Sequence, residues 1–248
     1  TTCVRAAGCR SGWLSTPVET HTYIFPEAVR NQATNPATGV QVVPPGYPAK
    51  WGSANADYQV DPDVVGDKDQ FGGLYRQTFV QDLKTGPTVS LVMARDDWFG
   101  PTGIYINESQ DGTERACSLE WIDPNGIQGF QINCAMAMQG GAKHDGGGTS
   151  LQRWKTFKLS MRPRFKTTAD VDRAGTRVST DGPSRLDYPV FPDSPVKSLD
   201  TFVLDEVLSN AWNHAGQHMY SSYFQDQYVS DLHNAMGGHS PHGLYAHV

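Results

Sequence analysis

The sequence predicts an α+β fold: an antiparallel sheet of about five or six strands, one long C-terminal helix packed on it, and extended loops. Apolar residues alternate over 130–138 and 154–161, which is typical of strands with one buried face, and apolar runs at 88–93, 115–122 and 200–204 indicate further strands. Aromatic and aliphatic residues spaced by three and four predict a helix over 217–236, which Gly237 and Gly238 end.

The chain divides by pattern into three parts. Residues 1–25 contain two short strands, 4–7 and 20–25, and are interpreted as the end of a β-sandwich-like module whose earlier strands would precede Thr1. Residues 26–87 are a loop-rich linker that wraps the core, with short helices predicted at 26–32 and 73–83. Residues 88–248 carry most of the predicted sheet and the long helix, and we expect further sequence beyond Val248, since the chain stops inside a strand pattern.

Composition and charge exclude several classes of protein. The 248 residues suffice for a substantial core, and 25 glycines and 16 prolines indicate many loops. The net charge of −6 gives no support for a nucleic acid partner, and no apolar run is long enough to span a membrane. The chain begins without an initiator methionine or a signal peptide, which suggests removal of an upstream segment.

A glycine-rich segment between the two alternating strands is the leading candidate site. Gly140, Gly141 and Lys143 belong to a stretch with five glycines in nine residues, and Lys155 and Lys158 follow in the next strand. Glycines let backbone N–H groups approach a ligand closely, so the segment can hold an anion such as phosphate. The alternative is a plain hairpin connection, which glycine content alone does not exclude.

Two groups of residues are candidate metal ligands. Asp61 and Asp63 belong to a run of alternately spaced carboxylates that can bind Ca²⁺, although the glycine and terminal glutamate of an EF-hand loop are missing. The alternative role of these aspartates is turn and cap chemistry. His214 and His218 have the i, i+4 spacing of helix-face ligands, which would suit a metal-dependent hydrolase, but they do not form HExxH. Their alternative is a polar loop.

Cysteines and tryptophans leave further alternatives open. Cys3 with Cys9, and Cys117 with Cys134, are either disulfides or pairs of free thiols. Exposed tryptophans would suit a carbohydrate-binding or scaffold module, whereas strand and turn patterns favour a place in the core. The six tryptophans are Trp13, Trp51, Trp98, Trp121, Trp154 and Trp212.

Residues 20–248 resemble the secreted CotH kinase-like proteins, named after a spore-coat protein kinase, in the branch common in environmental bacteria such as planctomycetes. The order of the matching pieces, rather than any single piece, carries the resemblance. They are 22–25, 44–52 (PPGYPAKWG), 56–65 (ADYQVDPDVV), 89–105 (VSLVMARDDWFGPTGIY), 122–126, 130–133, 138–142, 155–159, 226–227 and 235–243 (AMGGHSPHG). Residues 1–25 are similar to the end of a chitobiase-type or fibronectin-III-associated sandwich.

The resemblance implies an atypical kinase fold that binds ATP and Mg²⁺, with residues 88–161 as a sheet like a kinase N-lobe. It implies that the segment 140–148 covers phosphates, with Lys155 or Lys158 pairing with them. It also implies a secreted or cell-envelope location and a protein or polysaccharide partner. The chain departs from the family at Asp205-Glu206, where a basic residue is usual, and near His218, where an arginine is usual. Because the family's catalytic carboxylates would lie beyond residue 248, we expect nucleotide binding without phosphoryl transfer.

Overall fold

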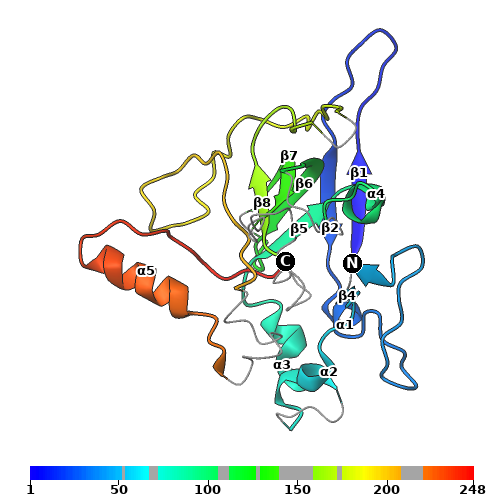
Figure 1. Ribbon diagram of the computed structural model, residues 1–248, viewed down its shortest axis with the longest axis vertical. Helices are drawn as coiled ribbons and strands as arrows, with labels where there is room; N and C mark the ends of the chain where they lie inside the picture. The colour runs from blue at the N-terminus through cyan, green and yellow to red at the C-terminus, as the bar shows by residue number, and fades with distance from the viewer. Residues whose placement is uncertain are drawn as a thin grey trace, which may run out of the picture. The chain divides into compact units, whose positions relative to one another are not determined.

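The computed structural model describes residues 1–51, 54–66, 72–105, 112–126, 129–139, 159–171, 175–207 and 220–248. Within these residues the chain is a mixed α and β structure with antiparallel sheets and few helices (Figure 1), as the sequence predicts. It divides into two compact units. The first contains Thr1–Arg95, Ser118–Gln131 and Ala246–Val248, and the second contains Asp96–Cys117 and Ile132–Tyr245.

The largest sheet has four strands in the order β5-β6-β7-β8. These are β5 (Thr88–Val92), β6 (Arg115–Ile122), β7 (Gly129–Met138) and β8 (Met161–Arg164). Sequential strands are neighbours; β5 pairs antiparallel with β6, and β7 pairs antiparallel with β8. The sequence predicts five or six strands, whereas this sheet has four within the described residues. The predicted strands at 200–204 and at the C-terminal end contribute only isolated bridges.

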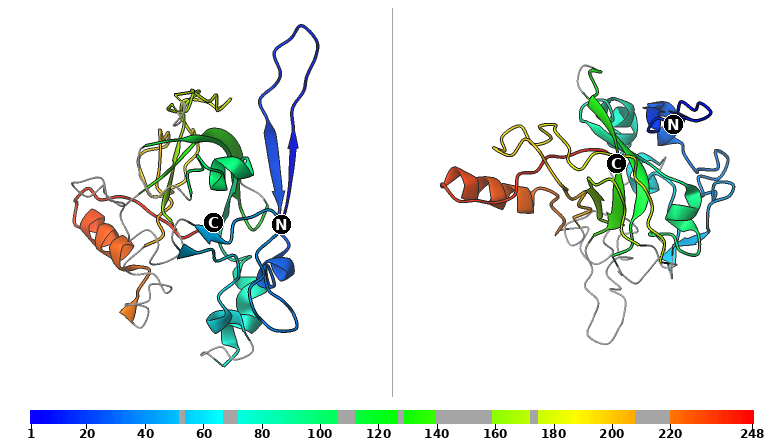
Figure 2. Two further views of the ribbon diagram at one scale, coloured as in Figure 1. Left: turned by 45° about the vertical axis from the view of Figure 1, so that its right-hand side comes forward. Right: turned by 90° about the horizontal axis from the view of Figure 1, so that it is seen from above.

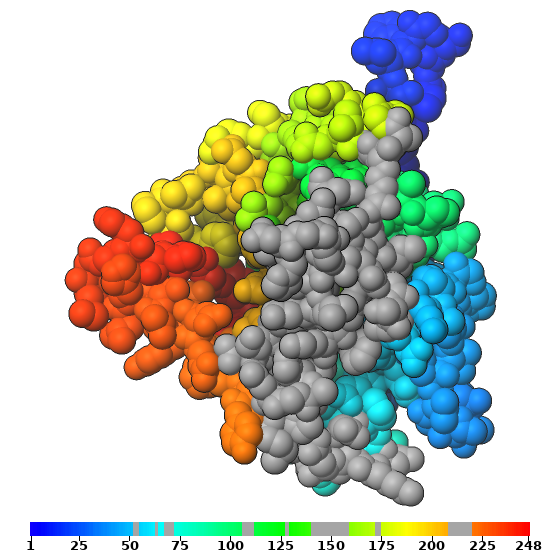
Figure 3. Space-filling view, viewed as in Figure 1, coloured from blue at the N-terminus to red at the C-terminus, as the bar shows by residue number. Residues whose placement is uncertain are grey.

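In the first unit, an N-terminal hairpin is tied to two strands of the sheet. β1 (Thr2–Ala6) and β2 (Glu19–Tyr23) pair antiparallel, and residues between them form the long arm seen in the left view of Figure 2. The side chains at its tip are exposed, as the blue atoms of Figure 3 show. The buried Thr20 hydroxyl donates to Ser118 Oγ at 2.9 Å, and Thr22 Oγ1 lies 2.8 Å from Ser90 Oγ. These bonds hold β2 against β6 and β5.

The loop-rich part of the first unit is organised by a few side chains. Trp51 is buried, packs edge-on against Tyr58 and donates to its hydroxyl at 3.1 Å. Gln41 accepts hydrogen bonds from the backbone N–H groups of Tyr58 and Gln59 and donates to Ala56 O. The short strands β3 (Lys50–Trp51) and β4 (Ala54–Asn55) pair beside this cluster, although the sequence predicts only loop there.

Three helices of the first unit lie together in Figure 1: α1 (Pro26–Arg30), α2 (Pro62–Val65) and α3 (Leu74–Asp82). α1 and α3 agree with the predicted helices, whereas α2 is a single turn within the aspartate-rich stretch. The C-terminal residues join this unit through β5, because Val89 N–H donates to His247 O at 2.7 Å and His247 N–H donates to Pro87 O at 2.9 Å. The predicted C-terminal strand is thus a single parallel bridge.

In the second unit, β7 is buried on both faces over Ile132–Ala137. The predicted alternation is present, with Cys134 and Met136 on one face, but Ala135 and Ala137 on the other face are buried as well. β8 begins at Met161, later than the predicted strand 154–161, of which residues 154–158 lie outside the described residues. The alternation of buried residues continues through Pro163 and Phe165.

The free edge of β8 is covered by the segment that contains the predicted strand 200–204. Met161 and Leu204 exchange backbone hydrogen bonds of 2.9 and 2.8 Å, and Phe165 N–H donates to Asp200 O at 2.8 Å. The Thr201 hydroxyl donates to Pro163 O at 2.7 Å. Isolated bridges replace a continuous strand here, so the segment adds partners to β8 without lengthening the sheet as predicted.

Two helices belong wholly or mainly to the second unit. α4 (Arg95–Phe99) occupies the predicted turn after β5, and Ile104 and Tyr105 N–H groups donate back to Asp97 O and Trp98 O. α5 (Gln225–Ala235) is shorter than the predicted helix 217–236, of which 217–219 lie outside the described residues. No side chain of α5 is buried, which differs from the expectation of a helix packed on the sheet.

Candidate functional site

The two ends of the glycine-rich segment are held together at one end of the β7–β8 pair. Met138 pairs with Met161, and Gln139 N–H donates to Ser160 O at 2.8 Å, so residues 140–158 connect adjacent antiparallel strands. Ser160 is fixed in turn, because its hydroxyl donates to Asp205 Oδ1 at 3.0 Å and accepts from Glu206 N–H at 3.0 Å. The described residues on either side of the segment 140–158 are therefore hydrogen-bonded to each other and to residues 205 and 206.

A row of three cations follows along β8 and its extension. Arg162, Arg164 and Lys166 alternate with the buried Met161, Pro163 and Phe165, so the three cations share one face of the extended chain. Residues two apart on a strand are about 7 Å apart, a spacing that suits several oxygens of one anionic ligand. Opposite them on β7 lie Ala137, paired with Arg162, and Ala135, paired with Arg164. We call these three residues the β8 cation row.

A fully buried carboxylate anchors part of the β8 cation row. Glu114 has 0% exposure; its Oε1 lies 3.1 Å from Arg164 Nη1 and its Oε2 lies 2.8 Å from Lys166 Nζ. Asp170 N–H also donates to Glu114 Oε2 at 3.0 Å. The two cations remain partly exposed, at 42% and 29%, so they keep access to solvent while Glu114 fixes their positions.

The neighbouring Arg115 has a structural role. Its side chain is 3% exposed and lies 3.3 Å from Asp97 Oδ1 through Nε. Its two terminal nitrogens donate to Thr102 O at 2.7 Å and Glu114 O at 3.0 Å. Arg115 therefore ties the loop after α4 to the start of β6 and holds the backbone at Glu114.

The structure leaves most predicted site residues undescribed. Gly140, Gly141, Lys143, Lys155 and Lys158 lie outside the described residues, as do His214 and His218. Their roles as ligands stay predictions. The described ends of the segment, Gln139 and Leu159, show only that the two predicted lysines precede the β8 cation row in the chain.

The described part of the aspartate-rich stretch contains a single helical turn, α2. Asp61 precedes α2, and its backbone oxygen accepts from the N–H groups of Val64 and Val65 at 3.1 Å; Asp63 lies within the helix. Desolvation is the main cause that raises the pKa of Asp57, and the negative charge of Asp61 adds to it. Among the described residues, no three His, Cys, Asp or Glu side chains form a group that could hold a metal ion.

All four cysteines are free thiols. Cys3 and Cys9 are exposed, whereas Cys117 on β6 and Cys134 on β7 are buried. A hydrogen bond with the Cys117 thiol, followed by burial, raises the pKa of Cys134 well above its usual value. Cys134 is therefore an unreactive thiol at neutral pH.

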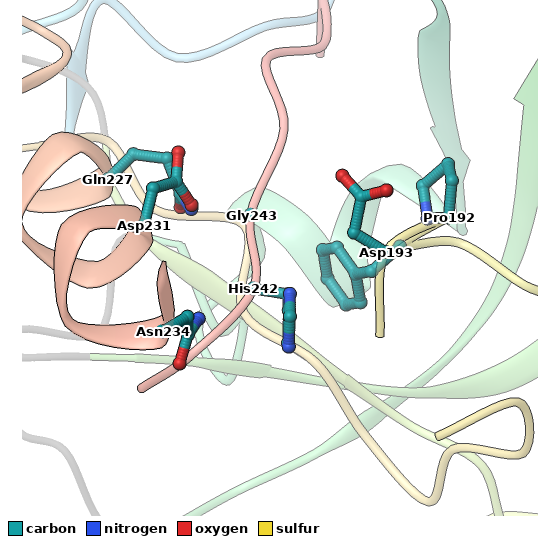
Figure 4. A pocket seen from close by; sticks show the side chains of 8 residues that line it. Pro192, Asp193, Gln227, Asp231, Asn234, His242 and Gly243 are labelled. Atoms are coloured by element: carbon teal, nitrogen blue, oxygen red, sulfur yellow. The ribbon is translucent and has the colours of Figure 1, made fainter. Parts of the chain in front are cut away.

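A small pocket lies elsewhere in the second unit, with a volume of about 270 Å³ (Figure 4). Gln227, Asp231 and Asn234 of α5 form one side, Pro192 and Asp193 lie opposite, and His242 and Gly243 come from the C-terminal segment. Phe191 also lines the pocket. The lining combines planar hydrogen-bonding groups with one aromatic ring, a combination that suits a small polar ligand.

The predicted tryptophans divide between core and surface. Trp51 and Trp121 are buried, at 5% and 8% exposure, whereas Trp13 at the hairpin tip is 70% exposed and stacks under Arg10. Trp98 is half-buried against Phe99 and Tyr105. Trp154 and Trp212 lie outside the described residues.

The sequence analysis missed Glu114 and the β8 cation row. A signal was present for the row, because Met161, Pro163 and Phe165 alternate with Arg162, Arg164 and Lys166 and extend the preceding pattern. Nothing local pointed to Glu114, which lies about fifty residues earlier in the chain than the cations that it contacts.

No protein-family model, curated protein sequence or solved structure matches this chain. None of the helices in the described part of the chain has the length and apolar character needed to cross a bilayer.

Proposed function

We propose that this chain carries the nucleotide-phosphate-binding lobe of a secreted CotH kinase-like protein and binds ATP–Mg²⁺. The observation that carries the proposal is the combination of a glycine-rich connection with a cationic strand at its exit. Gln139 and Ser160 close the β7–β8 ladder at the base of the segment 140–158, and Arg162, Arg164 and Lys166 follow immediately. Backbone N–H groups and cations are the groups that bind phosphates in proteins.

The ordered resemblance to the CotH kinase-like family supports a nucleotide as the ligand. In that reading the segment 140–148 covers the phosphates, and Lys155 or Lys158 supplies the paired cation. The antiparallel order β5-β6-β7-β8 is compatible with a lobe built around one sheet. The buried Glu114 supports the proposal because it holds Arg164 and Lys166 in fixed positions without covering them.

A titration with ATP–Mg²⁺ tests the proposal. The melting temperature of the protein is measured over nucleotide concentrations up to several millimolar, with adenosine as the control ligand. A ligand that binds only the folded state stabilises it by RT ln(1 + [L]/Kd), about 2.7 kcal/mol at one hundred times Kd. We expect a concentration-dependent rise with ATP–Mg²⁺ and little rise with adenosine; no rise with ATP–Mg²⁺ in a folded sample would overturn the proposal.

The pocket beside α5 favours a second candidate function, a non-catalytic module that binds carbohydrate. Amide, carboxylate and imidazole groups with an aromatic ring can bind the hydroxyl groups and the apolar face of a sugar. The exposed aromatic residues nearby in the sequence add to this argument: Tyr220, Tyr223, Phe224, Tyr228 and Tyr245.

Pull-down on insoluble cellulose and chitin discriminates this second candidate. The Asp193→Ala variant removes a carboxylate from the pocket, and Asp187→Ala removes an exposed carboxylate from the same stretch as its matched control. Binding that is reduced by Asp193→Ala but not by Asp187→Ala supports a carbohydrate module. If the unchanged protein and both variants all remain in the unbound fraction, the chain does not bind these glycans and the carbohydrate-binding function is excluded for them.

A further inference from the structure

Arg162 differs from the other members of the β8 cation row because nothing in the described chain satisfies its charge. Arg164 and Lys166 both contact Glu114, whereas no ion pair or hydrogen bond joins the Arg162 side chain to another described residue. Its Nε atom is buried and has no hydrogen-bond partner. Arg162 is therefore a half-buried guanidinium without an acceptor among the residues that the structure describes.

An unsatisfied guanidinium is unfavourable in the folded protein. Arginine does not lose its proton at accessible pH, so it cannot avoid the cost by becoming neutral. A buried N–H without an acceptor loses its hydrogen bond to water and gains none in return. The side chain paired across the strand, Ala137, has no acceptor to offer. Nε is the one Arg162 nitrogen that is both buried and without an acceptor, whereas the terminal nitrogens reach solvent. A ligand oxygen, best with a negative charge, would supply the acceptor that Nε lacks.

The position of Arg162 fits a phosphate group. It lies one residue after the Met138–Met161 pair and two residues after Ser160, whose backbone oxygen closes the ladder at the base of the glycine-rich segment. Arg164 points to the same face about 7 Å along the strand. A planar guanidinium offers two parallel N–H groups to a phosphate, which a lysine cannot do.

We infer that Arg162 is a phosphate-binding residue that contacts a phosphate of the ligand, with Arg164 as the second cation and Glu114 as the residue that positions Arg164. This inference rests on the proposed function, because it assigns the anion that the lobe binds. It goes beyond the proposed function because it assigns a phosphate contact to Arg162, which belongs neither to the glycine-rich segment nor to the predicted pair Lys155 and Lys158.

Equilibrium binding of two ligands, ATP–Mg²⁺ and inorganic tripolyphosphate, tests the assignment by calorimetry. The variants are Arg162→Gln, Arg162→Lys and, as the matched control, Arg177→Gln, which changes an exposed arginine of the same unit. We expect Arg162→Gln to weaken both ligands at least tenfold, since charge-assisted hydrogen bonds are lost. Arg162→Lys keeps the charge but not the planar geometry, so its loss is intermediate, and Arg177→Gln binds within twofold of the unchanged protein.

A second measurement separates this role from a structural one. Because Arg162 has no partner in the described chain, the melting temperature of ligand-free Arg162→Gln is expected to equal or exceed that of the unchanged protein. A drop in the ligand-free melting temperature would identify Arg162 as a structural residue and overturn the assignment.

The outcomes also distinguish this inference from the proposed function. If the unchanged protein binds ATP–Mg²⁺ and Arg162→Gln binds it equally well, the assignment of Arg162 is wrong while the nucleotide proposal stands. If tripolyphosphate binds in a manner that depends on Arg162 but ATP–Mg²⁺ does not bind, the phosphate assignment stands and the nucleotide proposal falls. If neither ligand binds the unchanged, folded protein, both are overturned.

Discussion

Glu114 is the residue on which the geometry of the β8 cation row depends. It has no exposed surface. Lys166 Nζ and the backbone N–H of Asp170 contact its Oε2, whereas Oε1 lies within ion-pair distance of Arg164 but accepts no hydrogen bond. A carboxylate that is removed from water is stabilised by nearby cations and N–H groups, so the loss of any of these partners is unfavourable. The partial exposure of Arg164 and Lys166 limits that cost, because water can solvate them if the carboxylate is removed.

We predict that Glu114→Gln lowers the free energy of unfolding by about 2–3 kcal/mol, since charged hydrogen bonds are replaced by weaker neutral ones at a buried site. Urea unfolding followed by circular dichroism measures the change. Asp170→Asn is the matched control: its carboxylate is 51% exposed and lies 3.5 Å from Lys166 Nζ, so its loss costs less than about 1 kcal/mol. Equal losses for the two variants would contradict the central role of Glu114.

Cys134 gives a prediction that depends on pH. Its pKa is raised in the folded protein by the hydrogen bond with Cys117 and by burial, so the folded state retains a proton that the unfolded state releases above about pH 8.5. The stability associated with this thiol is complete below that pH and is lost as the pH rises further, by up to about 1.4 kcal/mol per pH unit for one group. The Cys134→Ala variant should therefore lose less stability than the unchanged protein as the pH rises from about 8.5 to 10, measured as the free energy of unfolding at each pH. An equal loss in the two proteins would refute the raised pKa of Cys134.

The same environment predicts which thiols react. Native protein treated with iodoacetamide at pH 8 should be labelled at Cys3 and Cys9, which are exposed, and protected at Cys117 and Cys134. Mass spectrometry of peptides locates the label, and the same reaction in denaturant is the control, with all four sites accessible. Rapid native labelling of Cys134 would show that β6 and β7 do not bury it as described.

At the scale of elements, the connection between β6 and β7 follows directly from its sequence. Asp123 accepts from Asn125 N–H through its side chain at 2.8 Å and from Gly126 N–H through its backbone at 2.9 Å. Gly126 has φ of +68°, the left-handed conformation that glycine adopts without strain. The Asp-Pro-Asn-Gly turn was predicted because these residue types suit these conformations.

We predict that Gly126→Ala destabilises the protein by about 1–2 kcal/mol, the cost of a left-handed conformation for a residue with a Cβ atom. The change in melting temperature measures the effect. Gly86→Ala is the control, because a Cβ atom there would meet only His247 Nε2 at an ordinary distance of 3.9 Å. If Gly126→Ala is as stable as Gly86→Ala, the turn does not constrain the hairpin.

The sequence located β8 less well than β6 and β7. The partial alternation over 154–161 predicted a strand that ends at Met161. In the structure, Pro163 occupies β8, opposite Met136, and the free edge of β8 is paired only by isolated bridges to 201 and 204. The strand therefore continues to Arg164, and its cations become part of the candidate site.

The helix α5 shows a different limit of sequence patterns. Apolar residues at intervals of three and four correctly indicate a helix, yet Tyr228, Val229 and Leu232 are exposed. Periodicity tells which residues share a face of a helix, but not what covers that face.

The ion pairs of Glu114 could not be predicted from local sequence either. Glu114 is distant in the sequence from Arg164 and Lys166, and only the fold brings these side chains together.

At the scale of the whole molecule, net charge and local charge lead to different expectations. The chain carries −6 and has a pI of about 5.7, which argues against an extended polyanion as its partner. The β8 cation row nevertheless places three positive side chains on one face within five residues. A compact anion such as a polyphosphate can bind such a row without a basic surface elsewhere.

The central claim is that the glycine-rich segment and the cations around it bind nucleotide phosphates. The most direct test is displacement of a fluorescent ATP analogue by ATP–Mg²⁺, compared between the unchanged protein and the double variant Lys155→Met/Lys158→Met. Lys197→Met, an exposed lysine, is the control. The account predicts that ATP–Mg²⁺ displaces the analogue saturably from the unchanged protein and from the Lys197→Met control. The double variant should bind the analogue and ATP–Mg²⁺ at least tenfold more weakly. Absence of analogue binding by the folded, unchanged protein, or equal binding by the double variant, would contradict it.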